Sequence, residues 1–185
     1  KVYDWAMAQP LHPVFASEFI RKVRDFHTYA IARDGEGWRV RGDGELRTLR
    51  LPPALGVPAM GASQGVAGYA PGVEGPYVHL ASGRAWLKTA AAAASPGSAE
   101  TSRSPYLRDA NARINGWTPQ NASGQTAFDL KGFGPLEFAL AGASGCQVQA
   151  NGRALAPASA SVSSSTSNYR LPDAAAHIQI LCPVR

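Results

Sequence analysis

The residues that could carry hydrolytic or metal chemistry are present in this sequence but are not grouped. The histidines stand alone, and no His-Glu-x-x-His or Cys/His spacing typical of a metal site surrounds them. We expect no nucleophile elbow, and no spacing among the carboxylates singles out a catalytic pair. The sequence therefore predicts no catalytic site, no metal site and no cofactor in this chain. The four histidines are His12, His27, His79 and His177.

Aromatic residues point instead to ligand binding. In the segment YVHL, Tyr77 and His79 share one face of a predicted strand, and Val78 and Leu80 share the other. Sugar-binding modules place aromatic rings on a sheet face, where they stack on the sugar, and add a few polar groups that fix its orientation. Core packing is the alternative for each tryptophan. We predict four carbohydrate-facing residues, with rings for stacking and an imidazole for hydrogen bonding: Tyr77, His79, Trp86 and Trp117.

The charge of the chain is moderately basic. Its 185 residues include 18 Lys and Arg against 13 Asp and Glu, which gives a net charge of +5. The basic residues form no long run, and no nucleic-acid-binding motif accompanies them. The sequence therefore predicts a solvated basic surface and no nucleic-acid partner, with an acidic glycan or a membrane surface as the alternative. No apolar run is long enough to predict a membrane span.

The two cysteines lie in matching positions of two predicted strands. In CQVQA and HIQILC, each cysteine falls on the same face as the apolar residues of its strand. If these strands pair antiparallel, Cys146 at the start of one meets Cys182 at the end of the other. We expect a disulfide, with two buried free thiols as the alternative. A disulfide indicates an oxidising compartment, and hence a periplasmic or otherwise exported protein.

The first 28 residues are predicted to form one or two short helices. Pro10 and Pro13 interrupt the pattern, and Ser17 is expected to cap the second helix. That helix carries an apolar stripe that must pack on something. The stripe consists of Phe19, Ile20, Val23 and Phe26.

After residue 28 the apolar period changes to two, which predicts strands. The turn signals Asp34-Gly35 and Asp43-Gly44 separate short strands expected at 28–33, 37–41 and 45–51. Glycine and proline in 54–76 predict a long surface loop with at most a brief strand.

The second half of the chain is strand-like throughout. Residues 89–104 are low in complexity and predict a flexible excursion between the two halves. Beyond them, short alternating segments follow one another, and Asn151-Gly152 predicts a hairpin turn. We therefore expect a mainly β protein, an antiparallel β-sandwich or jelly-roll-like domain over 29–185, preceded by the helical segment 1–28.

Several segments together resemble the C-terminal part of the periplasmic enzymes that hydrolyse and deacetylate the Pel exopolysaccharide. The resemblance implies that 1–28 is the end of a polysaccharide-deacetylase barrel and that a β-sandwich follows it. In that family an Asp and two His hold the deacetylase metal in upstream motifs, and none of these motifs has a counterpart here. The segments are HPVFASEFIRKVRDF, YAIARDGEGWRVRGDGELRTLRLP, GPYVHL, SPYLRDANARINGW and FGPLEFALAG with CQV.

The resemblance and the aromatic residues together predict a non-catalytic accessory domain. It would bind or position an amino-sugar exopolysaccharide for an adjoining deacetylase during polymer export and biofilm formation. A structural or docking module that caps the catalytic domain, or that contacts a secretion-complex protein, is the main alternative. A self-contained glycan hydrolase is a weaker one. Deacetylation leaves a cationic polymer, which a basic domain repels, so the acetylated polymer is the better match.

Overall fold

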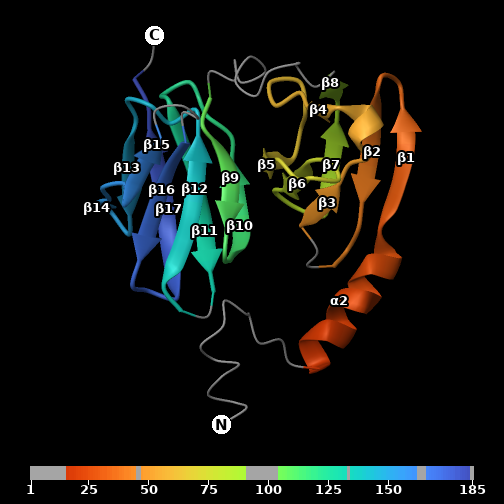
Figure 1. Cartoon of the computed structure of the whole chain (residues 1–185), viewed down its shortest axis with the longest axis horizontal. Helices are drawn as coiled ribbons and strands as arrows, with labels where there is room; N and C mark the ends of the chain where they lie inside the picture. Colours follow the sequence, from red (N-terminus) through yellow and green to blue (C-terminus); the bar gives the residue numbers. More distant parts are fainter. Residues whose placement is uncertain (1–15, 45–46, 91–103, 133, 162–165, 184–185) are drawn as a thin grey trace.

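The computed structural model describes residues 16–44, 47–90, 104–132, 134–161 and 166–183. The protein is mainly β, with one described helix at its N-terminal end, as the alternating sequence predicts. Figure 1 shows two groups of strands side by side, one from each half of the chain. We call residues 16–90 the N-terminal half and residues 104–183 the C-terminal half.

The N-terminal half contains one α-helix, one 3-10 helix and eight strands. They are α2 (Ala16–Thr28), β1 (Ala30–Asp34), β2 (Gly37–Arg41), β3 (Thr48–Arg50), η1 (Pro53–Leu55), β4 (Val57–Pro58), β5 (Val66–Ala70), β6 (Tyr77–Leu80), β7 (Arg84–Leu87) and β8 (Thr89–Ala90). The C-terminal half contains β9 (Tyr106–Ala110), β10 (Arg113–Thr118), β11 (Gln125–Lys131), β12 (Leu136–Ala141), β13 (Gln147–Ala150), β14 (Arg153–Ala154), β15 (Ser159–Ser161), β16 (Thr166–Leu171) and β17 (Ala175–Leu181).

One seven-stranded sheet runs through both halves. Its strand order is β15-β16-β12-β9-β5-β6-β3, and the halves meet where β5 pairs with β9. This pair is parallel, with Gly68 beside Leu107, whereas the other pairs in the sheet are antiparallel. A Cβ at Gly68 would collide with the backbone of Leu107. The seam between the halves therefore depends on a residue without a side chain.

In the C-terminal half, a second sheet covers one face of the long sheet. This five-stranded sheet has the order β10-β11-β17-β13-β14. Alternate residues of both sheets point into a common core, as a sandwich requires. The largest fully buried members of this core are Leu107, Phe128, Leu130, Leu136, Leu140, Ile178 and Ile180.

In the N-terminal half, the opposite face of the long sheet is the covered one. The register pairs Leu140 with Leu107 and Ala141 with Tyr106, so successive residues of β9 and β12 face opposite sides. Leu107 enters the C-terminal core, while Tyr106 enters the N-terminal core and stacks on Tyr69. The three-stranded sheet β1-β2-β7 closes that second core. The core includes Val40, Tyr69, Val78, Leu80, Leu87 and Tyr106.

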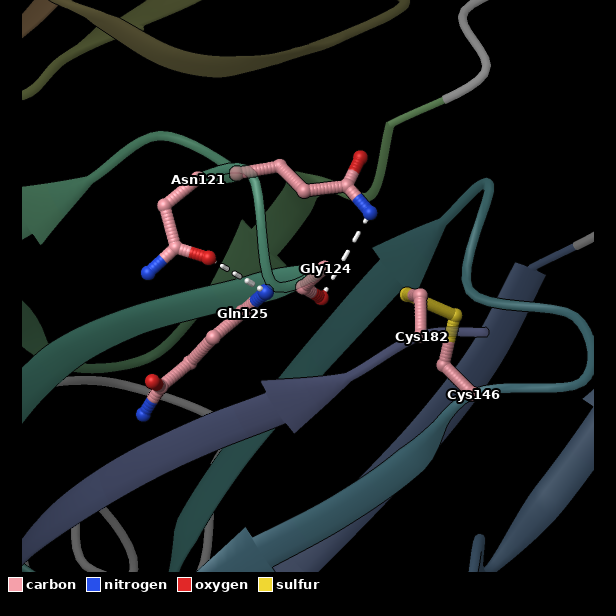
Figure 2. The surroundings of a disulfide bond; sticks show 6 residues. Asn121, Gly124, Gln125, Cys146 and Cys182 are labelled. Carbon is pink, nitrogen blue, oxygen red and sulfur yellow. Dashed lines mark hydrogen bonds between the residues drawn. A yellow bond between two sulfur atoms is a disulfide. The ribbon is translucent and has the colours of Figure 1, made fainter. Parts of the chain in front are cut away.

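The predicted disulfide is present in the structure. Cys146 and Cys182 stand opposite each other just beyond the last paired residues of β13 and β17, with 4.2 Å between their Cα atoms. Figure 2 shows the bond beside the turn that holds Asn121 and Gly124. The Cys182 amide donates to the Gly124 carbonyl at 3.0 Å. The disulfide and this hydrogen bond fix the same end of the five-stranded sheet.

The helix differs in part from its prediction. Helix α2 begins at Ala16, so Ser17 lies within its first turn and is not the cap; the helix expected before Pro10 lies outside the described residues. Its C-terminal end is tied to the segment after β2, where the Asp43 amide donates to the Thr28 hydroxyl. In Figure 1, α2 leads into the start of β1, and none of its residues is buried. The apolar stripe is therefore exposed.

Most strands of the N-terminal half lie close to their predicted positions, but their pairing is less local. The turn after β1 uses Gly35 with a positive φ, as the Asp-Gly signal predicts. Strand β3 follows the Asp43-Gly44 bend but pairs with β6, in a different sheet from β2. The surface loop expected at 54–76 is wrong, because β5 lies there and is almost wholly buried.

Two other predictions concern the segments around 89–104 and 151–152. Asn151 and Gly152 both have positive φ and join β13 to β14, so the predicted hairpin is confirmed. Thr89 and Ala90 form β8, which pairs with β4, so the start of the predicted excursion is strand. Residues 91–103 lie outside the described residues.

Candidate functional site

In the N-terminal half, Tyr77 and His79 lie on the face of the long sheet that no second sheet covers. Both belong to β6, where Val78 and Leu80 point into the N-terminal core and are fully buried. Tyr77 is 40% exposed. The alternation predicted for YVHL is therefore confirmed, and one face of this strand is open to ligands.

Both ring nitrogens of His79 already have polar partners within the fold. Its Nε2 lies 3.2 Å from the Arg108 carbonyl oxygen, and its Nδ1 lies 3.5 Å from the Thr48 hydroxyl. A neutral ring with the proton on Nε2 donates to the carbonyl and accepts from the hydroxyl, so one tautomer fits both contacts. Burial lowers the pKa of His79, although the Arg108 carbonyl and Asp109 act in the opposite direction. His79 therefore supports the sheet and offers little to a ligand.

Tyr77 has a charged neighbour on the same face. Arg50 stands directly opposite it on β3 and forms an ion pair with Glu74. The Tyr77 ring also lies against Gly72, where a Cβ would come within 2.5 Å of Cε2. This surface offers one partly exposed ring beside a charge pair that is already satisfied.

Trp117 lies in the other half of the molecule. It belongs to β10 and stacks on Phe128, with 5.0 Å between the ring centroids. Phe128 is fully buried, and Trp117 packs against the C-terminal core. This ring closes an edge of the sandwich.

Trp86 lies on the outer face of the three-stranded sheet, away from both cores. Its neighbours on β7, Ala85 and Leu87, point inward and are buried. The indole covers Gly37, where a Cβ would come within 2.7 Å of two ring atoms. Its Nε1 donates to the Asp34 carbonyl oxygen at 3.3 Å. A glycine on the adjacent strand and a backbone acceptor thus hold this ring across the sheet.

Three arginines share this outer face with Trp86. The register of β2 and β7 places Arg39 opposite Trp86 and Arg41 opposite Arg84. Arg39 forms an ion pair with Asp34 at 2.5 Å. Within the described part of the chain, no ion pair joins Arg41 or Arg84 to a carboxylate, and both are exposed. Two arginines without a carboxylate partner among the described residues therefore lie opposite each other on neighbouring strands.

These residues line an open hollow of about 850 Å³. The hollow is large enough for a few sugar rings, because binding sites for small ligands begin at roughly 300 Å³. Its character is basic and aromatic, with one acidic side chain. The polar and aromatic side chains that line it include Arg39, Arg41, Asp43, Gln64, Arg84 and Trp86.

Two kinds of catalytic arrangement are relevant to the described residues, a metal cluster and a nucleophile elbow. No cluster of three or more His, Cys, Asp or Glu among them could hold a metal ion. The segment 61–65 reads Gly-Ala-Ser-Gln-Gly, the letters of a nucleophile elbow that sequence reasoning missed. Strand β5 follows it directly, where an elbow would lead into a helix. Ser63 is hydrogen-bonded to the backbone of Lys88 through its hydroxyl.

A histidine–carboxylate pair does occur on the C-terminal half. Nδ1 of His177 lies 2.7 Å from Asp129 on the outer face of the five-stranded sheet. Orientation of an imidazole by a carboxylate is typical of catalytic triads. Among the described hydrogen bonds, none joins this imidazole to a hydroxyl or thiol, so no nucleophile completes the arrangement.

The four predicted carbohydrate-facing residues thus lie in three separate places. Tyr77 and His79 share one sheet face, Trp86 lines the hollow, and Trp117 packs on a core. Sequence reasoning missed the arginines. Alternation in GWRVRG could have placed Arg39 and Arg41 on one strand face, and alternation in GRAWL could have placed Arg84 beside Trp86. The pairing of those two strands is not visible in the sequence. The missed residues are Arg39, Arg41 and Arg84.

No family model matches the chain, and neither the curated proteins nor the solved structures gave a match. The resemblance to the Pel hydrolase and deacetylase family therefore stays a prediction. No helix in the described residues combines the length and apolar character needed to cross a membrane.

Proposed function

We propose that this chain is a non-catalytic β-domain that binds polysaccharide through the Arg-lined hollow around Trp86. One observation carries the proposal: the Trp86 ring rests on Gly37 and lines an open hollow of about 850 Å³. The reason is chemical, since an aromatic ring that lines an open hollow can stack on the C–H groups of a sugar.

The side chains around Trp86 supply the second requirement of a sugar site. Sugar hydroxyls need hydrogen-bond partners in fixed directions, and guanidinium and amide groups provide several donors each. Arg39 and Gln64 flank Trp86 on its two sides, since β2 pairs with one edge of β7 and Gln64 bridges to the other. Donors thus stand on both sides of the ring.

The setting of this domain also remains a proposal. The resemblance places it beside a polysaccharide deacetylase in an exported protein, where it would hold the polymer for the adjoining domain. The disulfide is compatible with export. The basic hollow disfavours a deacetylated, cationic polymer, because its arginines would repel the free amino groups.

The test is affinity electrophoresis of the whole chain through native gels that contain neutral, acetylated amino-sugar or acidic polysaccharides. Three proteins are compared: the natural chain, Trp86→Ala and Tyr77→Ala. We expect at least one polysaccharide to retard the natural chain, and we expect Trp86→Ala to weaken that binding at least about tenfold. Tyr77→Ala removes an exposed ring from the other surface and serves as the matched control.

The outcomes separate the two surfaces. Loss of retardation in Trp86→Ala alone supports the hollow as the binding site. Loss in Tyr77→Ala alone keeps the glycan function but moves it to the open face of the long sheet. No retardation by any polysaccharide contradicts the proposal. Near-ultraviolet circular dichroism of each variant shows whether the fold is intact.

One observation favours a second candidate function, the docking of a neighbouring domain. Phe19 and Phe26 of α2 are 64% and 66% exposed, and Ile20 and Val23 lie on the same helix with 50% and 42% exposure. Exposed apolar patches of this kind mark protein contacts. In this function α2 would pack against the adjoining catalytic domain. Phe19→Ser with Phe26→Ser should then release that domain when it is added separately, and unchanged association would exclude the role.

A further inference from the structure

The outer face of the three-stranded sheet carries an unfavourable charge arrangement. Arg41 and Arg84 are directly opposite each other on neighbouring strands. Like charges in this position destabilise a sheet, because their Cβ atoms are only about 5 Å apart. Elsewhere on the N-terminal half, Arg50 pairs with Glu74, and Lys88 pairs with Glu36. Arg41 and Arg84 face each other across two strands without such a carboxylate partner among the described residues.

The aromatic ring lies next to this pair on the same face. Trp86 is two residues from Arg84 along β7, which places both side chains on one side of the sheet. Arg39, opposite Trp86, is already engaged by Asp34, whereas Arg41 and Arg84 are not engaged by any carboxylate in the described residues. A stacking surface and a free anion-binding pair thus stand one sheet spacing apart, roughly 5 to 7 Å.

We infer that the hollow binds an acidic polysaccharide, with a sugar ring stacked on Trp86 and a carboxylate of the same chain held between Arg41 and Arg84. The inference rests on the proposed function and specifies its ligand. Guanidinium groups match carboxylates in planar, paired hydrogen bonds, so two of them recognise a uronate more strongly than hydroxyls alone. A carboxylate also removes the repulsion between the two arginines.

A single-stranded nucleic acid is also an anionic polymer, but it fits the hollow less well. Proteins that bind single strands stack successive bases on several rings along a basic track. Among the described residues that line the hollow, Trp86 alone is aromatic.

The test uses four probes and matched variants of the whole chain. The probes are polygalacturonate, alginate, carboxyl-reduced polygalacturonate and single-stranded DNA. The variants are Arg41→Gln, Arg84→Gln and Trp86→Ala. Arg153→Gln is the control, because it removes one exposed charge from the hairpin of the C-terminal half. We expect a carboxylated polymer to bind, the reduced polymer to bind at least about tenfold more weakly, and rising salt to weaken the first interaction.

Each variant has its own expected result. Arg41→Gln and Arg84→Gln should weaken binding of the carboxylated polymer about ten- to hundredfold. Neither should alter binding of the reduced polymer, because the stacked ring remains. Arg153→Gln should change binding by less than about twofold. The arginine variants lie on an exposed face, and thermal unfolding confirms that they fold.

Other outcomes overturn the inference. Binding of neutral polymers that depends on Trp86 but not on Arg41 or Arg84 would leave the proposed function standing without an acidic ligand. If neither carboxylated polymer retards the chain, the inference is likewise overturned. Equal weakening by Arg153→Gln shows diffuse charge attraction, and tighter binding of single-stranded DNA assigns the hollow to nucleic acid. No binding of any probe or neutral glycan overturns both proposals.

Discussion

The two halves of this molecule share the seven-stranded sheet, but opposite faces of it are covered in the two halves. In the C-terminal half, the five-stranded sheet covers the long sheet, and a disulfide fixes one end of the sandwich. In the N-terminal half, the three-stranded sheet covers the opposite face and leaves Tyr77 and its neighbours exposed. Tyr77, Trp86 and the opposed arginines all lie in the N-terminal half.

This difference shows how stability and surface chemistry can be divided between the two halves of one molecule. The larger core belongs to the C-terminal half, which contains most of the fully buried side chains. The N-terminal half has a smaller core, and its three-stranded sheet carries the opposed pair Arg41 and Arg84. Unfavourable charges on the three-stranded sheet are tolerable when a well-packed neighbouring half anchors the long sheet against which that sheet packs.

The largest expected effect is a loss of stability in the C-terminal half when its disulfide is removed. Replacement of both cysteines, Cys146→Ala with Cys182→Ala, should lower the free energy of unfolding by about 3–4 kcal/mol, because a loop of this length is no longer closed in the unfolded chain. Urea unfolding measures the loss. A reducing agent should destabilise the natural chain by a similar amount and leave the double variant unchanged; equal stability of all samples would contradict the role of the bond.

The next effect concerns the seam that couples the halves. Gly68→Ala places a methyl group against the backbone of Leu107 and should cost about 1–3 kcal/mol. Because this pair joins the halves, the variant should also unfold in two steps, with the N-terminal half first. Tyrosine and tryptophan fluorescence during urea unfolding follows both steps.

Gly61→Ala is the matched control for the seam. An added Cβ at Gly61 meets nothing within 4 Å, so stability should change by less than about 0.5 kcal/mol. A single cooperative transition in Gly68→Ala, with the stability of the natural chain, would show that the halves do not depend on this contact.

A smaller gain in stability is expected from a substitution inside the C-terminal core. Thr126 is fully buried, and its hydroxyl has no hydrogen-bond partner among the described residues. Thr126→Val removes the unsatisfied group at nearly the same volume and should stabilise the protein by about 1 kcal/mol. Thr118→Val is the control, since that hydroxyl donates to the Ala127 carbonyl. A gain in the control as large as in Thr126→Val would reject the explanation.

The smallest effect is a pH dependence of the N-terminal half. Burial holds the pKa of His79 below its ordinary value of 6.5, so the unfolded chain takes up a proton before the folded chain does. Stability is therefore complete above about pH 6.5 and falls as the pH drops toward the folded pKa. His79→Gln should flatten this slope in unfolding measurements from about pH 7 to about pH 5. An unchanged slope would assign the acid sensitivity to other groups.

Local sequence patterns predicted the elements better than their pairing. The phase of Cys146 and Cys182 and the Asn151-Gly152 turn depend on neighbouring residues, and both predictions are confirmed. Strand β5 was missed because it is central and buried on both faces, so it shows no alternation. Its glycine, which resembles a loop signal, is required by the close approach of β9.

For the candidate site too, local patterns predicted single residues better than contacts between distant strands. The exposure of Tyr77 follows from alternation within YVHL, which the sequence shows directly. The opposition of Arg41 and Arg84 depends on the register between two strands that are far apart in the chain. Hydrogen bonding across the fold likewise occupies His79, and no local pattern signals its contact with Arg108.

The support beneath Trp86 has a consequence for the thermodynamics of binding. The contact with Gly37 and the hydrogen bond to Asp34 restrict the rotation of the indole before any ligand arrives. The loss of side-chain entropy at this residue therefore occurs during folding. A ligand that stacks on the ring meets a surface of fixed shape, and the ordering cost that commonly weakens association, about 0.5–1.5 kcal/mol for a mobile side chain, does not recur there.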